Sequence, residues 1–205
     1  MSGNDIITII FVAAFLGVCF CYYRVFWEPL RQREAELIES IQSIAGYTVE
    51  NAALYFDTIS QNLQKSQLLR SSWRKYESSL VKDAVGKQVY STADAEEFFS
   101  MPALTAGLNV SFFSSLAGIF TGLGILGTFV GLTYGLWGMD TGDTAALANS
   151  IRQLLGGANT AFLTSIFGIV LGIFFSVVHS IEIKRFQQEI NEFCETLDQR
   201  FPRKN

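Results

Sequence analysis

Acidic and basic side chains are missing from long stretches of this 205-residue chain. Ile6 to Tyr23 and Gly107 to Met139 carry no charge, and His179 is the only ionisable group between Arg152 and Glu182. Uncharged apolar runs of this length are not typical of a soluble domain. A helix of about 20 apolar residues, in contrast, is long enough to cross the hydrocarbon core of a bilayer. The sequence therefore predicts an all-α integral membrane protein with three transmembrane helices, listed by residue as about 5–24, 110–138 and 156–181.

Basic residues are scarce outside two parts of the chain, and their distribution predicts an orientation. Nine of the 15 Lys and Arg residues lie within residues 24–87, five follow His179, and Arg152 alone lies between the second and third spans. By the positive-inside rule, the segment 25–107 and the tail 182–205 are expected in the cytoplasm.

The N-terminal segment 1–24 is expected to begin outside the cytoplasm, as is the loop 140–155. This segment has no basic residue at its start and no small-x-small cleavage site before Arg24. A cleaved signal peptide has a basic start and a small-x-small cleavage site, so the lack of both argues against one here. We therefore expect a retained first helix, an outer loop between the second span (108–139) and the third (156–181), and an N-out, C-in topology.

Cysteine and histidine are rare. Cys19, Cys21 and Cys194 match no metal or disulfide spacing, so we expect buried thiols without a chemical role. The sequence contains one histidine and offers no nucleophile–base pair or metal-ligand cluster. We therefore expect neither an enzyme nor a bound cofactor.

An acidic run, "STADAEEFFSMP" (91–102), precedes the second span. Asp94 is expected to cap a short helix, with Glu97 three residues further on. Asp94, Glu96 and Glu97 are weak candidates for a cation site. The alternative is that these carboxylates only oppose the dipole of a helix start.

The cytoplasmic segment 25–107 has helical periodicity. Pro29 suits the first turn of a helix, and a second helix is expected over about 48–82. Gly46 and Gly86 are the expected breaks. The apolar residues that share one face of the first of these helices are Leu37, Ile41 and Ile44.

The tail 182–205 carries apolar residues at alternating steps of three and four: Ile183, Phe186, Ile190, Phe193 and Leu197. This spacing is typical of a coiled-coil seam. It suits an amphipathic helix packed on the helices of residues 24–100 equally well. In both cases the third span is expected to continue as a helix into the tail.

The run "GLGILG" (122–127) matches the G-x-G-x-x-G pattern of dinucleotide-binding turns, and Asp140 follows. That pattern requires a strand before the first glycine and a helix that opens at the last. Here the glycines lie in the middle of an uncharged span, where a pyrophosphate has no place. The sequence therefore argues against a nucleotide site.

Small residues share one face in each of the last two spans, at 100° per residue. In the second span they are Thr121, Gly124, Thr128, Gly131 and Gly135. In the third they are Ala158, Ala161, Ser165, Gly168, Gly172 and Ser176, followed by His179. Each face carries a hydroxyl near the middle of the membrane.

Two interpretations of these faces stay open. Small residues let transmembrane helices approach closely, and a polar groove can also line an ion path. No span contains a carboxylate. An ion path would therefore need an intramembrane acid from a partner, held in a protected interior.

The runs "GLGILGTFVGL" (122–132) and "GANTAFLTSIFGIVLGI" (157–173) resemble the cores of the last two spans in the MotA/TolQ/ExbB family of proton-channel subunits. Three further runs, "ADAEEFF", "TFVGLTYGL" and "NTAFLTSIFG", are most similar to the Zorya-type, anti-phage members of that family. The resemblance is specific over about 92–181. Two departures are the missing proline at the end of the last core and the absence of a long cytoplasmic tail after Asn205, which leaves a truncated chain as one interpretation.

The resemblance implies a multi-pass protein of the bacterial inner membrane. Five copies would surround two transmembrane helices of a MotB/ExbD/ZorB-like partner dimer, each with an intramembrane aspartate. The implied function is that of a stator subunit in a rotary motor driven by the proton-motive force, with H⁺ as the transported ion and Na⁺ as the alternative. No direct nucleic-acid binding is expected.

Roles for individual residues follow from the resemblance. The pore hydroxyls map onto Thr128 and Ser165, which the helical faces also select, and Thr164 flanks them. His179 is a candidate proton relay or a wet interfacial side chain, and Thr121 and Ser176 are expected to pack or to contact water. Close helix packing is expected at Gly124, Gly127, Gly131, Gly135, Gly168 and Gly172.

Two other functions remain open on the sequence. One is an energiser of outer-membrane transport or envelope integrity, like ExbB and TolQ. The other is a non-conducting anchor, in which three helices hold the cytoplasmic tail at the membrane. The anchor needs no partner with an intramembrane acid, whereas both ion-driven functions do.

Overall fold

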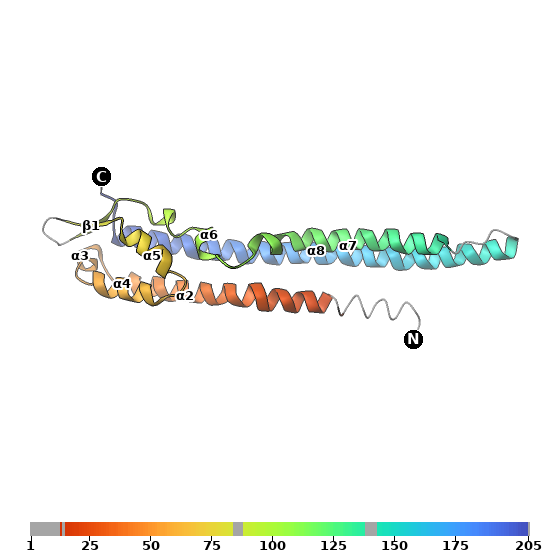
Figure 1. Ribbon diagram of the computed structural model, residues 1–205, viewed down its shortest axis with the longest axis horizontal. Coiled ribbons are helices and arrows are strands. Elements are labelled where there is room, and N and C mark those ends of the chain that lie inside the picture. Colours follow the sequence, from red (N-terminus) through yellow and green to blue (C-terminus); the bar gives the residue numbers. More distant parts are fainter. Residues whose placement is uncertain (1–12, 14, 84–87, 138–142, 205) are drawn as a thin grey trace. The chain divides into compact units, whose positions relative to one another are not determined.

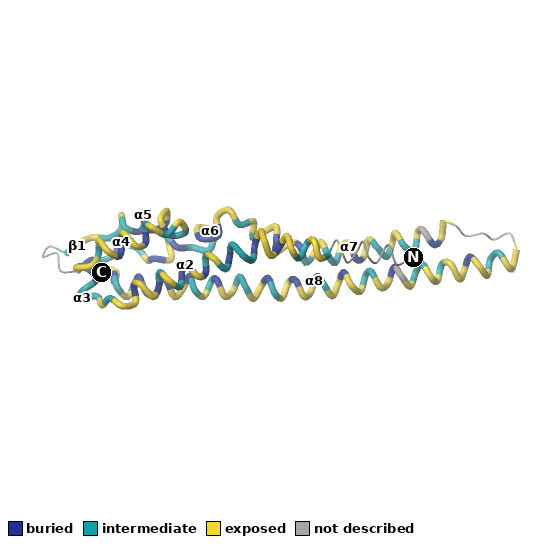
Figure 2. Tube along the Cα trace, turned by 90° about the horizontal axis from the view of Figure 1, so that it is seen from below, coloured by how far each residue is buried: buried dark blue, intermediate teal, exposed yellow. Residues whose placement is uncertain are grey.

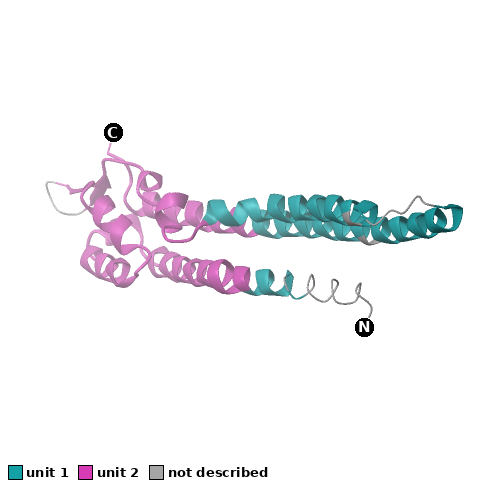
Figure 3. Cartoon of the chain, turned by 45° about the vertical axis from the view of Figure 1, so that its right-hand side comes forward, with its two compact units in different colours: residues 1–20, 110–181 teal, residues 21–109, 182–205 magenta. Residues whose placement is uncertain are grey.

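A computed structural model of the chain describes residues 13, 15–83, 88–137 and 143–204 (Figure 1). These residues are mostly helical, as predicted. The chain divides into two compact units, residues 1–20 with 110–181 (unit 1) and residues 21–109 with 182–205 (unit 2) (Figure 3). Each unit is described by itself below.

Unit 1 contains two helices that are long and apolar enough to cross a membrane, by length and composition. They are α7 (Val110–Trp137) and the part of α8 (Thr144–Arg200) that ends at Ile181, and the two lie side by side. Their apolar parts coincide with the second and third predicted spans. The first predicted span, 5–24, falls mostly outside the described residues, although residues 15–22 are helical.

The start of α8 differs from the prediction. Residues 144–155, expected in the loop 140–155, belong to this helix. Asp143 caps it, since its carboxylate accepts a hydrogen bond of 2.6 Å from the Ala146 N–H and so satisfies one of the free donors of the first turn. The helix also continues without a break to Arg200, so the predicted continuation of the third span into the tail is confirmed.

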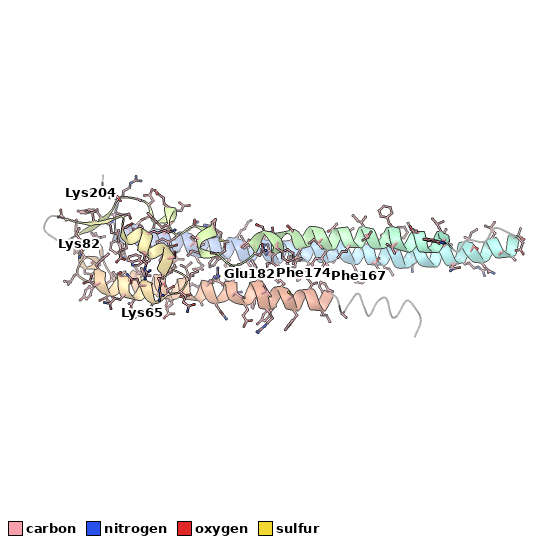
Figure 4. All side chains as sticks on the ribbon, in the orientation of Figure 1. Lys65, Lys82, Phe167, Phe174, Glu182 and Lys204 are labelled. Carbon is pink, nitrogen blue, oxygen red and sulfur yellow. The ribbon has the colours of Figure 1, made fainter. Side chains whose placement is uncertain are left out.

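Many large apolar side chains of unit 1 are exposed, and exposed residues (yellow in Figure 2) recur along both of its long helices. Phe129 of α7 is 65% exposed, and Phe167 and Phe174 of α8, labelled in Figure 4, are 60% and 65% exposed. A surface of this kind is far more apolar than a soluble monomer tolerates. Contact with lipid or with other transmembrane helices accounts for it.

Pro29 lies in the first turn of α2 (Glu28–Ala45), as predicted, although the residues directly before this helix are helical too. The π-helical turn Tyr23–Trp27 leads directly into α2. Proline lacks an N–H and crowds the carbonyl of the preceding turn, and a π turn is one way to relieve that conflict. The predicted apolar face is confirmed, with Leu37, Ile41 and Ile44 buried, and α2 ends at Gly46 as predicted.

The helix predicted over 48–82 is wrong as a single element. It is divided into α3 (Val49–Ala52), α4 (Phe56–Lys65) and α5 (Arg70–Glu77). The Ser66 hydroxyl accepts a hydrogen bond from the Leu69 N–H at 3.0 Å, so the side chain supports a turn in place of another helical step. The fold-back brings the Trp73 indole N–H within 3.0 Å of the Ser60 hydroxyl.

The chain is also not entirely α-helical. Strand β1 (Leu80–Lys82) pairs antiparallel with β2 (Val89–Ser91), with Leu80 opposite Ser91. Hydroxyls of Ser78 and Ser79 donate to carbonyls three residues earlier and close the end of α5 before β1 begins. The predicted break at Gly86 lies outside the described residues.

The acidic run forms a short 3-10 helix, Ala95–Glu97, followed by α6 (Met101–Leu104). Asp94 occupies the N-cap position, as predicted, but makes no capping bond with its side chain. Instead Asp198 of α8 accepts a hydrogen bond from the Ala95 N–H at 3.1 Å. Capping of this helix by a distant residue cannot be read from local spacing.

The apolar seam of the tail packs inside unit 2. Phe186, Ile190, Phe193 and Leu197 are buried, and the Phe193 ring meets Phe99 edge-on at 5.0 Å. After α8, Phe201 stacks near Trp73, and two backbone hydrogen bonds join Ser91 to Pro202 and Lys204. The structure therefore favours the amphipathic helix packed on residues 24–100 over the coiled coil.

One buried carboxylate lies beside this seam. Glu34 of α2 is 5% exposed, and its oxygens lie 3.4 Å from Arg31 and 2.9 Å from Arg185 of α8. Arg31 also lies 3.7 Å from Glu182. A buried charge requires such partners, because an unpaired one is strongly destabilising.

We expect Leu197→Ala to destabilise the purified chain much more than Leu54→Ala. Leu197 is fully buried and Leu54 is 78% exposed. Removing a buried leucine costs about 2–5 kcal/mol, which corresponds to a fall in melting temperature of roughly 10 °C or more for a unit of this size. Differential scanning fluorimetry in detergent measures both variants, and equal melting temperatures would contradict the packed tail.

Candidate ion-pathway site

The two long helices of unit 1 contact each other through the small residues that the sequence places on one face of each. Gly124 of α7 lies against Ser165 and Gly168 of α8. A Cβ atom built on Gly124 would be 3.0 Å from the Ser165 carbonyl oxygen, and one built on Gly168 would be 2.7 Å from Gly124 Cα. Backbone meets backbone here, at a separation that only glycine permits.

Two more close approaches flank this crossing. A Cβ atom on Gly131 would lie 2.7 Å from Ala161 Cβ. A Cβ atom on Gly172 would lie 2.6 Å from Thr121 Oγ1. Such distances are well inside van der Waals contact, so both glycines hold the helices together along several turns.

The remaining glycines of α7 fall into two groups. Gly127 and Gly135 face α8 less tightly, since a Cβ atom would lie 3.1 Å from Thr164 Oγ1 and 3.1 Å from Leu154 Cδ1 respectively. Gly122 has nothing within 4 Å of such an atom. The glycines of "GLGILG" therefore divide between the helix contact and the open side.

The hydroxyls of Thr128 and Thr164 converge on one backbone oxygen. Thr128 Oγ1 donates to the Ala161 carbonyl at 3.2 Å and approaches the Gly124 carbonyl at 3.3 Å. Thr164 Oγ1 donates to the same Ala161 carbonyl at 2.8 Å. Both threonines are half-buried, so the sequence-predicted residues Thr128 and Thr164 lie together at one level of the helix pair.

Ser165 and Thr121 lie on the same contact. Ser165 is half-buried, and its hydroxyl makes no hydrogen bond to the described part of the chain. Thr121 donates to the Ala117 carbonyl at 3.1 Å, within its own helix. Ser176 is exposed. Thr121, Thr128 and Thr164 each donate a hydrogen bond, whereas the Ser165 side chain makes none to the described part of the chain.

His179 is 6% exposed, and its ring stacks on Phe175 with centroids 6.1 Å apart and planes 9° apart. The structure therefore shows the His179 ring covered and packed against an aromatic neighbour on α8. Its neighbours on the same helix are Ser176, which is exposed, and Ser180, which is exposed as well.

Sequence reasoning missed two residues of the helix contact, Leu154 and Gly157. A Cβ atom on Gly157 would lie 3.4 Å from the Gly131 carbonyl oxygen. Leu154 belongs to the predicted loop 140–155. The predicted small-residue face of the third span contains Ala158 and does not contain Gly157. The Asp143 cap, at the head of a run without Gly or Pro up to Leu155, is the signal that reveals the longer helix.

The acidic candidates for a cation site in unit 2 do not form a metal-binding cluster. Asp94 forms an ion pair of 3.0 Å with Arg203, and Glu96 and Glu97 are exposed. Among the residues that the structure describes, no three His, Cys, Asp or Glu side chains are arranged to hold a metal ion.

The tail thiol is chemically protected as well. Cys194 is buried, and burial raises its pKa to about 12, with Asp198 and Glu96 adding to the shift. Because the thiolate is the reactive form, this shift disfavours reaction of the Cys194 thiol at neutral pH. The prediction of buried thiols is confirmed for Cys194, whereas Cys19 is half-buried and Cys21 is exposed.

The chain matches a family model described as "Anti-phage protein ZorA, Zorya type I system" over residues 3–203. It is similar to the Zorya protein ZorA of Escherichia coli O139:H28 (strain E24377A / ETEC), with 29% identity over 203 residues, 93% of this chain and 27% of that protein. A second Zorya protein ZorA, from Escherichia coli strain ATCC 8739 (Crooks), is 48% identical over 54 residues, 26% of this chain and 9% of that protein. The chain thus spans about a quarter of the length of the first relative.

We expect Gly168→Ala to separate α7 from α8, whereas Gly122→Ala leaves them in place. The new methyl group at 168 would collide with the Gly124 backbone, while the one at 122 meets open space. Overpacking of this kind costs about 1–3 kcal/mol, and alanine at 122 gains slightly in helix propensity.

Thermal unfolding of the detergent-purified chain compares the two variants. A melting temperature that falls by several degrees for Gly168→Ala and holds for Gly122→Ala is the expected result. If both variants have the melting temperature of the wild type, the close contact between the α7 and α8 backbones at Gly168 is contradicted.

Proposed function

This chain belongs to the ZorA-like family of Zorya anti-phage proteins, and from that premise we propose that it is the channel-forming stator subunit of an ion-driven membrane motor. Membership of the family supports a role in anti-phage defence. Because the chain spans about a quarter of its curated relative, the motor, its partner and its ion belong to the proposal.

The observation that carries the proposal is the group of hydroxyls at one level of an uncharged helix pair. Thr128 and Thr164 share the Ala161 carbonyl, and Ser165 lies beside them without a side-chain partner in the described chain. All three side chains are half-buried, so part of each faces outward. Polar groups in a membrane interior are expensive and mark pathways by default.

These hydroxyls suit a titrating carboxyl group brought by a partner. As they stand, Thr128 and Thr164 direct their protons to Ala161 and leave oxygen lone pairs that accept a hydrogen bond from a protonated carboxyl. Rotation of a hydroxyl, or the uncommitted Ser165, donates to the ionised form. A carboxyl group in wholly apolar surroundings would stay protonated. Hydrogen bonds from these hydroxyls stabilise the ionised form, so that both the protonated and the ionised forms can be populated.

The acid itself comes from another chain in this proposal. No carboxylate lies within residues 110–137 or 144–181, so we propose a partner dimer with one intramembrane aspartate in each of two single-span helices. Five copies of this chain around two partner helices cannot be symmetric together. Alternate protonation of the two acids then favours stepwise rotation, with about 2.3 kcal/mol available per charge crossing 100 mV.

We further propose the bacterial inner membrane, with the N-terminus outside and unit 2 in the cytoplasm. The distribution of basic residues supports this orientation. The transported ion is proposed to be H⁺, because hydroxyls beside a carboxyl group are enough to pass a proton. Neither a catalytic reaction nor a bound cofactor is part of the proposal.

A non-conducting anchor is the competing function, and one observation favours it. The small-residue faces of α7 and α8 largely bury each other within a single chain, as plain helix packing requires. The two functions differ in what the hydroxyls do. In an anchor they only satisfy the helix pair, whereas in a channel their loss stops ion transfer.

We expect Thr128→Val to reduce proton flux and phage protection by about tenfold or more. The change keeps the shape of the side chain and removes one hydrogen bond to a charged group, which is worth roughly 1.5–3 kcal/mol. Thr133→Val, on the same helix at an exposed position, is the matched control. Flux is measured in proteoliposomes of the full-length protein with its partner, and protection by plating efficiency in cells.

Melting temperatures of both variants separate the competing functions. A stable Thr128→Val protein that no longer conducts supports the channel. A stable variant that conducts and protects like the wild type overturns it and leaves the anchor. Equal loss of flux in Thr133→Val would place the pathway elsewhere on α7.

A further inference from the structure

Unit 2 holds a cavity of about 770 Å³ that the ion pathway does not use. It is lined by α2, by α5 with the turn before it, and by the segment from Glu97 to Ala106. Its volume lies within the range of small-molecule sites. Most such sites are mainly apolar, however, whereas this one is lined largely by polar and charged side chains.

Four charged side chains of both signs line the cavity: Arg33, Glu36, Lys75 and Glu97. None of them forms an ion pair within 4.0 Å in the described part of the chain. Elsewhere in the same unit opposite charges do pair, as Glu34 does with Arg31 and Arg185. Lys75 and Glu97 are exposed, and Arg33 and Glu36 are half-buried. The wall of the cavity thus carries two cations and two carboxylates outside any ion pair in the described residues.

Arg33 is held in a fixed position. One guanidinium nitrogen donates to the Leu104 carbonyl at 2.7 Å and the other to the Ala106 carbonyl at 2.8 Å. These bonds occupy two of its five N–H groups, which leaves three to bind something else. They also shape the turn at Gly107, whose φ of +81° favours glycine.

A hydroxyl is also available in the lining. Ser72 lines the cavity and is 6% exposed as a whole residue. Its side chain makes no hydrogen bond to the described part of the chain, and its oxygen is not among the buried atoms that lack a partner. The hydroxyl is therefore open to the cavity and can donate a hydrogen bond to a molecule there.

The place of the cavity in the chain indicates the kind of molecule. Ala106 precedes Val110, where α7 begins, and Pro29 follows the aromatic residues Tyr23 and Trp27. Aromatic side chains of this kind mark the headgroup level of a membrane. The cavity therefore belongs at that level in the proposed topology, which is the one point where this inference rests on the proposed function.

We propose that this cavity binds the zwitterionic headgroup of a phosphatidylethanolamine lipid. The phosphate lies between Arg33 and Lys75, the ammonium group lies against Glu36 and Glu97, and the Ser72 hydroxyl donates to a phosphate oxygen. Charge-assisted hydrogen bonds of both signs are satisfied at once. An anionic headgroup without an ammonium would leave two carboxylates facing it, and a neutral lipid would leave all four charges unpaired.

Native mass spectrometry of the full chain in detergent tests this, with phosphatidylethanolamine or phosphatidylglycerol of the same acyl chains added. We expect selective retention of phosphatidylethanolamine and about tenfold weaker binding in Lys75→Gln, from the loss of one charge-assisted hydrogen bond. Arg74→Gln, the neighbouring exposed residue of α5 that does not line the cavity, should bind like the wild type. Arg33 is left unchanged because it holds the Leu104 and Ala106 carbonyls.

Glycerophosphoethanolamine, which carries the headgroup without acyl chains, is the competitor. Displacement of the lipid by this compound, together with weaker binding in Ser72→Ala, assigns the recognition to the headgroup. Equal retention of both lipids, or equal weakening in Lys75→Gln and Arg74→Gln, would overturn the proposal. Thr128→Val should retain the lipid fully, so failure of the channel proposal would not be mistaken for failure of this one.

Discussion

The contact on which unit 1 depends is the approach of two helix backbones at Gly124 and Gly168. Lipid gives apolar helices no hydrophobic reason to associate, so close packing must supply the attraction. At this crossing the backbones are near enough that one added methyl group has no room. The same approach brings Thr128 of α7 within hydrogen-bond distance of the Ala161 carbonyl on α8. The polar group at mid-helix is therefore a product of the glycine contact, not a separate feature.

Unit 2 is held together by different means. Its core is a chain of aromatic rings in which Trp73, Phe99 and Phe193 are fully buried. In the proposed topology this unit lies in water, which provides a hydrophobic driving force for burying these rings that lipid does not provide for unit 1. A buried carboxylate, Glu34, is tolerated because Arg185 of α8 lies 2.9 Å from it. The helix α8 thus takes part in two kinds of packing along its length, small residues first and large rings afterwards.

Sequence patterns predicted the three longest helices, α2, α7 and α8, because long apolar faces leave a clear periodicity. The faces that contain Gly124 and Gly168 followed from spacing alone. The family resemblance instead came from whole sequence runs in the last two spans, and the family match bears it out. The breaks within 48–82 did not follow, because serine side chains such as Ser66 end or turn helices without Gly or Pro. Spacing also could not show that the two small faces meet in one chain, or that a distant Asp198 caps the acidic run. Those are tertiary contacts with no local signature.

The ladder of glycines in α7 has a consequence for how this segment can change in length. Each residue advances the helix by 100°, so a single insertion between Gly124 and Gly131 would rotate every later residue away from its present register. Val130 would then stand where Gly131 now meets Ala161. Loops between helices absorb insertions readily, but this stretch cannot. Its length is under as strict a constraint as its composition.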